Sequence, residues 1–76
     1  MFSEFLQSEI DDIEHQAAFT KEQQAVFDEL RKEENKDSVI MKQLGMSRNH
    51  YYKVKKVVAL KVLKIMARID DKAKTK

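Results

Sequence analysis

Residues 37–57 read DSVIMKQLGMSRNHYYKVKKV, and this stretch decides the fold that the sequence predicts. Gly45 is the only glycine of the chain and there is no proline, so one position can take a positive φ without steric cost. Ser47 follows closely and is a good helix N-cap. A short glycine-containing turn between two helices is typical of a helix-turn-helix unit. We predict that the contacts between these two helices come from Val39, Ile40, Leu44, Met46, Tyr51, Val54 and Val58.

The segments before this unit also have helical periodicity. Apolar residues recur at three- and four-residue spacing within residues 1–18, which predicts an N-terminal helix whose start could be Ser3 or Ser8. Thr20 and Gln23 form a capping-box pattern ahead of a second helix over residues 21–32. The apolar face of these two helices is predicted to consist of Phe2, Phe5, Leu6, Ile10, Ile13, Ala17, Val26, Phe27 and Leu30.

Polar residues 33–36 are predicted to form a loop, after which Asp37 caps a short helix over residues 38–44. No helix breaker occurs between Arg48 and Ile69, so one long C-terminal helix is expected there, followed by a charged tail at 70–76 that frays. Its apolar stripe continues through Val62, Ile65 and Ile69, and is widened by Ala59, Leu63 and Met66.

Together these segments predict an all-α chain of four helices with a helix-turn-helix and a long C-terminal recognition helix. A chain of 76 residues is one domain at most, with its central part at residues 20–69. The absence of cysteine excludes disulfides and thiolate metal sites. The acidic N-terminus has no long apolar run, so neither a signal peptide nor a membrane span is predicted and a cytoplasmic location is expected.

Charge is distributed very unevenly along the chain. Residues 1–37 contain four basic and eleven acidic residues, a net charge of −7, whereas residues 38–76 contain eleven basic and two acidic residues, a net charge of +9. This asymmetry indicates a polyanionic partner for the second half. The alternative is a solvated lysine face balanced by an acidic neighbouring helix. We favour the polyanion because the basic run coincides with the predicted recognition helix.

A helix that enters the major groove of DNA needs outward side chains near its N-terminus that reach base edges, with cations beside them for phosphates. Arg48 can bind guanine and Asn49 adenine, each through two hydrogen bonds. Tyr52 offers a hydroxyl and a ring, whereas Tyr51 lies on the apolar stripe and is predicted to be buried. For Lys42, a solvated lysine is an equal alternative to a phosphate contact. The predicted DNA-binding residues are Lys42, Ser47, Arg48, Asn49, His50, Tyr52, Lys53 and Lys56.

Asp11, Asp12 and His15 lie about one helical turn apart, a spacing that can hold a metal or support acid–base chemistry. We prefer to interpret them as a solvated polar face, because no second such cluster exists in the sequence. There is also no glycine-rich phosphate loop and no nucleophile–base pair. We therefore predict that the protein is not an enzyme and binds neither a metal nor a cofactor.

Residues 19–67 resemble region 4 of bacterial sigma factors and the sigma-like phage activators of the ArpU type. The segments that carry the resemblance are FTKEQQAVFDEL, LGMSRNHYYKVKK and ALKVLKIMA, and the order LGxS followed by YYxxKK is most similar to the phage group. The resemblance implies a helical domain whose last helix reads promoter DNA beside RNA polymerase. Met41 stands where that group usually has a small alanine, and the other sigma-factor regions are missing.

Two further interpretations remain open. The apolar residues 59–66 could make the chain an adaptor that docks on RNA polymerase or on a sigma or anti-sigma partner. The apolar face of the last helix is wider than one neighbouring helix can cover, so a second covering element is also predicted. The N-terminal helix can supply it within its own chain or across a two-fold axis, and we predict the second arrangement, a homodimer.

Overall fold

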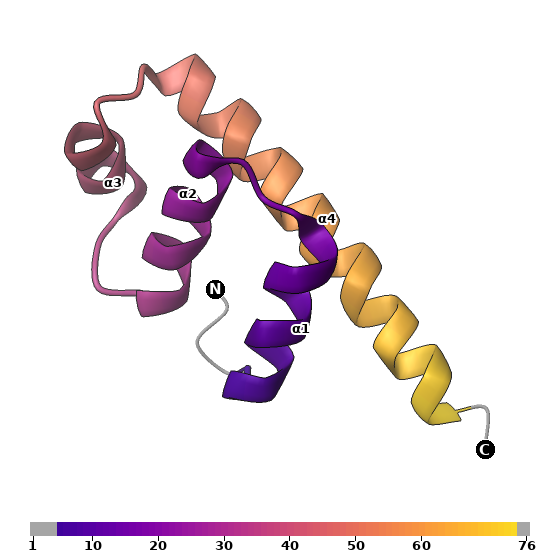
Figure 1. Ribbon diagram of the computed structural model, residues 1–76. Helices are drawn as coiled ribbons and strands as arrows, with labels where there is room; N and C mark the ends of the chain where they lie inside the picture. Colours follow the sequence, from indigo (N-terminus) through magenta and orange to yellow (C-terminus); the bar gives the residue numbers. More distant parts are fainter. Residues whose placement is uncertain (1–4, 75–76) are drawn as a thin grey trace.

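α4 (Arg48–Lys74) is the longest element, and the other helices lie on one side of it (Figure 1). The computed structural model describes the backbone of residues 5–74 and the side chains of residues 5–68. Within this part of the chain there are four α-helices and no β-strand, which confirms the predicted all-α class and the long C-terminal helix. The three helices that precede α4 are α1 (Gln7–Ala17), α2 (Lys21–Lys32) and α3 (Asp37–Leu44).

The hydrophobic core lies where α1 and α2 contact α4, and α2 also contacts α3. Each buried residue belongs to the apolar stripes that the sequence predicts, so the helical phase is confirmed across the domain. Full burial of such a side chain contributes roughly 1.5–3 kcal/mol, a large share of the stability of a small domain. The buried core residues are Ile10, Ile13, Ala17, Val26, Phe27, Leu30, Ile40, Tyr51, Val54, Val58, Val62 and Ile65.

Three predicted core residues are instead exposed. Leu6 is 67% exposed because it is the N-cap of α1 and lies outside the helix, so helical periodicity does not place it. Val39 is 40% exposed because α3 buries its neighbour Ile40 and packs Met41 and Leu44 against the core instead. Leu63 is 65% exposed and faces away from the core, whereas Met66 on the same widened stripe packs against it. Phe2 and the side chain of Ile69 lie outside the described residues.

The helix boundaries follow the local sequence with a few differences. The predicted capping box is confirmed, since Thr20 Oγ1 accepts from the Gln23 N–H (3.2 Å) and Gln23 Oε1 accepts from the Thr20 N–H (3.2 Å). The sequence predicts that Asp37 is the N-cap of α3. In the structure Asp37 is instead the first residue of the helix, and Lys36 occupies the cap position. α1 starts at Gln7, later than an N-terminal helix over residues 1–18 would, and α4 continues to Lys74, beyond the predicted end of the last helix.

The turn between α3 and α4 uses the conformation that glycine permits. Gly45 has φ +65° and terminates α3, with its N–H donating to the Lys42 carbonyl (3.3 Å). The Met46 N–H donates to the Met41 carbonyl (3.0 Å), so two carbonyls in the last turn of α3 are satisfied. A Cβ atom at position 45 would meet no neighbouring atom within 4 Å, so backbone conformation and not space favours glycine there.

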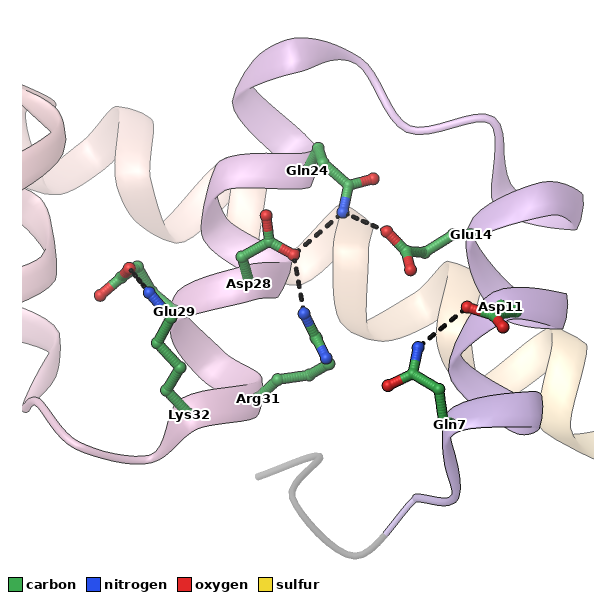
Figure 2. A network of polar contacts seen from close by, with 8 residues as sticks. All are labelled: Gln7, Asp11, Glu14, Gln24, Asp28, Glu29, Arg31 and Lys32. Carbon is green, nitrogen blue, oxygen red and sulfur yellow. Dashed lines mark hydrogen bonds and ion pairs between the residues drawn. The ribbon is translucent and has the colours of Figure 1, made fainter.

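The polar network of α1 and α2 includes one hydrogen bond between the two helices (Figure 2). The Gln24 amide of α2 donates to Glu14 of α1 and to Asp28 (3.0 Å), which in turn accepts from Arg31 (3.3 Å). α1 also contacts α4 within its own chain, whereas the sequence led us to predict this contact across a two-fold axis. Among the described residues, no helix is long and apolar enough to cross a membrane.

Candidate nucleic-acid interface

The first residues of α4 are fixed by the serine that precedes them. Ser47 Oγ accepts from the His50 N–H (3.3 Å), and the Ser47 carbonyl accepts from the Tyr51 N–H (2.8 Å). These bonds satisfy donors that a helix start leaves free, so Ser47 is the N-cap that the sequence predicts. The cap fixes the direction in which the side chains from Arg48 onward leave the helix.

The predicted base-reading and phosphate-binding side chains are all exposed. With about 100° of rotation per residue, Asn49, Tyr52, Lys53 and Lys56 fall on one side of α4, opposite the buried Val54. Within the described side chains, no ion pair involves the lysines of this surface. We call the exposed surface formed by Arg48, Asn49, Tyr52, Lys53 and Lys56 the basic face of α4.

The two adjacent tyrosines differ in burial as the sequence predicts. Tyr51 is fully buried, whereas Tyr52 is 42% exposed on the basic face. The two rings meet edge to face with their centroids 5.3 Å apart. The guanidinium carbon of Arg48 lies 6.0 Å from the centre of the Tyr52 ring, and Lys55 Nζ lies 5.8 Å from it. Tyr52 is therefore held by a buried ring and two cations.

Asp37 connects the start of α3 to α4. The Tyr51 hydroxyl donates to Asp37 Oδ1 (2.7 Å), and Lys55 Nζ donates to Oδ1 (3.1 Å) and Oδ2 (2.9 Å). The hydrogen bond from Lys55 is the main reason why the pKa of Asp37 lies below its ordinary value. Burial, aided by the nearby Asp37 carboxylate, raises the pKa of Tyr51 well above its ordinary value. Both shifts favour the pair of a neutral phenol and an ionised carboxylate.

These shifts predict a loss of stability at high pH. Above about pH 10 the unfolded chain releases the Tyr51 proton while the folded chain keeps it, so the free energy of unfolding falls as pH rises. Urea unfolding followed by circular dichroism at about pH 8 and about pH 11 measures this. Tyr51→Phe should show a smaller loss than the wild type, and the matched Tyr52→Phe should show the wild-type loss. An equal loss in all three proteins contradicts the assignment to Tyr51.

The remaining residues that are predicted to contact DNA lie around the basic face. Lys42 is exposed on α3, and Ser47 is exposed in the turn. His50 differs from the others because its Nε2 lies 2.6 Å from Glu22 Oε2 of α2, so its side chain is already engaged by an acid. The sequence does not predict the contact of His50 with Glu22, or that of Asp37 with Lys55, because the partners are far apart in the chain.

The acidic cluster predicted to be a solvated face has that character in the structure. Asp11, Asp12 and His15 are exposed on α1. Asp11 accepts a hydrogen bond from the Gln7 amide (2.9 Å), an ordinary contact between successive turns. Within the described residues, no group of three or more histidine or acidic side chains is arranged to hold a metal ion.

No protein-family model, no curated protein and no solved structure matches this chain. The features from which a function can be inferred are therefore its own: the all-α fold, the turn at Gly45 and the exposed side chains at the start of α4.

Proposed function

We propose that this protein is a sequence-specific regulator of transcription that binds double-stranded DNA. In this proposal α3, the turn and the start of α4 form a helix-turn-helix, and the first turns of α4 lie in the major groove. One observation carries the proposal: Arg48, Asn49, Tyr52, Lys53 and Lys56 are exposed together on the first turns of a helix whose opposite side is buried.

Each side chain of the basic face suits a different contact. Arg48 and Asn49 are at the very start of α4, where recognition helices reach base edges, and their forked groups match guanine and adenine. Lys53 and Lys56 are farther along the helix and are suited to phosphates. Lys42 on α3 supplies a phosphate contact from the neighbouring helix. Ser47 can add a phosphate contact, and so can His50 once it is released from Glu22.

Binding of a fluorescent duplex of random sequence, followed by anisotropy, tests the proposal. If Lys42, Lys53 and Lys56 each neutralise a phosphate, the affinity should fall about 40-fold between about 50 and about 200 mM salt. Selection from a random duplex pool should then enrich a common sequence. Absence of binding at the lower salt concentration, or binding that is independent of salt, overturns the proposal.

The resemblance to region 4 of sigma factors supports the regulatory part of the proposal and suggests a phage-type activator with RNA polymerase as a second partner. Met41, the departure from that pattern, is partly buried and packs against the core. Anisotropy with and without added RNA polymerase tests this point, since a joint complex on promoter DNA should bind more tightly than either protein alone.

A second candidate function is an adaptor that binds another protein. Val57, Leu60 and Leu63 are 39%, 48% and 65% exposed and lie on the outer side of α4, directly after the basic face. We call these residues the outer apolar stripe. They differ from the predicted docking residues 59–66, since Met66 packs against the core. Exposed Lys56 and Lys64 lie beside the stripe, so it complements an amphipathic helix with acidic flanks.

Salt separates the two candidates, because an apolar contact persists at a salt concentration that releases DNA. Leu63→Glu should then abolish binding to a protein partner and leave DNA binding unchanged. The homodimer predicted from the sequence, in which the N-terminal helix of one copy covers the last helix of the other, is a separate proposal, and the lysines beside the stripe would repel a second copy that docked on the stripe itself. Light scattering at micromolar concentration decides this point: a monomer mass that persists as the concentration rises rules the dimer out.

A further inference from the structure

Lys55 differs from the cations around it. It is the one lysine or arginine of α4 that is paired with an acid among the described side chains, with its ammonium bonded to both oxygens of Asp37. Its side chain is 21% exposed. Lys53 and Lys56, two residues before it and one after, are exposed and have no such partner within the described residues. The sequence KVKK thus contains lysines in two different states.

Asp37 is itself held in place by a second donor. The hydroxyl of Tyr51, a residue with no exposed surface, donates to Oδ1, so the carboxylate is fixed from the core side as well as by Lys55. Asp37 is also the first residue of α3, where a negative charge interacts favourably with the helix dipole. The carboxylate therefore has three stabilising interactions in the position where it binds Lys55, and its release would forfeit all of them.

Lys55 nevertheless lies beside the basic face. Its ammonium is 5.8 Å from the centre of the Tyr52 ring, and Arg48 approaches the same ring at 6.0 Å. If Lys55 were free, its flexible stem would bring another charge to this edge of the surface. A cation that binds any phosphate strengthens binding to all sequences equally and lowers the relative weight of base contacts.

We propose that Asp37 is a positioning residue that commits Lys55 to the contact between α3 and α4, and so keeps this lysine from binding DNA phosphates. The inference rests on the proposed DNA-binding function and names a determinant of its specificity. Asp37 also fixes the place of Lys55 beside Tyr52, so the ring is presented to DNA in one orientation. Sequence discrimination then depends on Arg48, Asn49 and Tyr52, with a limited number of phosphate contacts.

The salt dependence of binding to a random-sequence duplex counts the lysines that contact phosphate, since each changes the slope of log K against log salt by about 0.9. Lys53→Gln should reduce the slope by about this amount, whereas the matched Lys55→Gln should leave it unchanged. Asp37→Asn keeps an oxygen acceptor for Tyr51 and removes the charge that binds Lys55. This variant should steepen the slope by about 0.9, and adding Lys55→Gln to it should restore the wild-type slope.

A measurement without DNA tests the contact between Asp37 and Lys55 by itself. The melting temperatures of the wild type, Asp37→Asn, Lys55→Gln and the double variant form a double-mutant cycle, and the double variant should melt no lower than the less stable single variant. Additive losses overturn the inference. Equal reductions of the salt slope by Lys55→Gln and Lys53→Gln also overturn it, even where DNA binding is confirmed. If the wild-type chain does not bind the duplex at all, the proposed function fails and the specificity role of Asp37 fails with it.

Discussion

Val58→Asp should leave the chain unfolded at 25 °C. Val58 has no exposed surface and belongs to the hydrophobic core of the domain. It lies between Val54 and Val62 on the buried stripe of α4. A carboxylate there has no partner in the core, and such a charge costs several kcal/mol even after the surroundings relax. Stabilities of small domains begin at about 5 kcal/mol, so this cost is close to the whole. Far-ultraviolet circular dichroism on heating measures the result as loss of the helical signal and of the cooperative transition.

Val57→Asp is the matched control, because it makes the same change one residue earlier on the same helix. Val57 is 39% exposed and lies about 100° around the helix from Val58, so an aspartate there remains in water. We expect this variant to retain a cooperative transition, with a change in stability of about 0.5 kcal/mol, the usual scale for surface substitutions. If both variants melt alike, the buried stripe of α4 is assigned to the wrong side.

The contrast between neighbouring valines shows why the fold could be predicted from the sequence. In a helix, the spacing of apolar residues determines which side is buried, so Ile13, Phe27 and Val58 could be assigned to the core without a structure. Local hydrogen bonding works over a similarly short range. The capping box at Thr20 and the left-handed turn at Gly45 therefore agree with their predictions.

The wrong core assignments arise where periodicity gives no answer. Leu6 has the right spacing but precedes the first helical residue, and its N–H donates to Glu9 Oε1 (2.9 Å) at the start of α1. Val39 precedes the buried Ile40, and Leu63 follows the buried Val62. Whether such a residue is exposed depends on how wide a strip of its helix the neighbouring helix covers. The packing of one helix on another determines the width of the covered strip, and the spacing of apolar residues along a single helix does not predict it.

The candidate site likewise has features that the sequence predicts and features that it does not. Exposure of Arg48, Lys53 and Lys56 follows from their phase on α4 and was predictable. The pairing of Asp37 with Lys55, and that of Glu22 with His50, joins residues that are 18 and 28 positions apart. Such pairs depend on the crossing of α2 and α3 with α4. The sequence indicated a helix cap for Asp37, a role that needs only local geometry, and missed the contact across helices.

The double variant Arg48→Ala/Lys53→Ala should bind DNA weakly while remaining folded. Both side chains are exposed on the basic face, so their truncation removes no core contact. Loss of a base contact with two hydrogen bonds costs roughly 1–3 kcal/mol, and loss of a phosphate contact removes about 0.9 from the salt slope. The affinity should therefore fall between about tenfold and a few hundredfold. Anisotropy with a duplex obtained by selection measures the loss, and circular dichroism verifies the helical content.

The chain contains its own control for this variant. Arg68→Ala/Lys64→Ala removes one arginine and one lysine from the same helix, and these residues are also exposed but follow Leu63, at the end of the outer apolar stripe that is farther from the basic face. Net charge and helix composition change equally in the two double variants, so a difference between them can only reflect position. We expect the control to stay within about threefold of the wild-type affinity, because the distant charges act on DNA only through a screened field. Equal losses in both variants would mean that α4 attracts DNA as a uniformly charged rod, and that its first turns do not read the sequence.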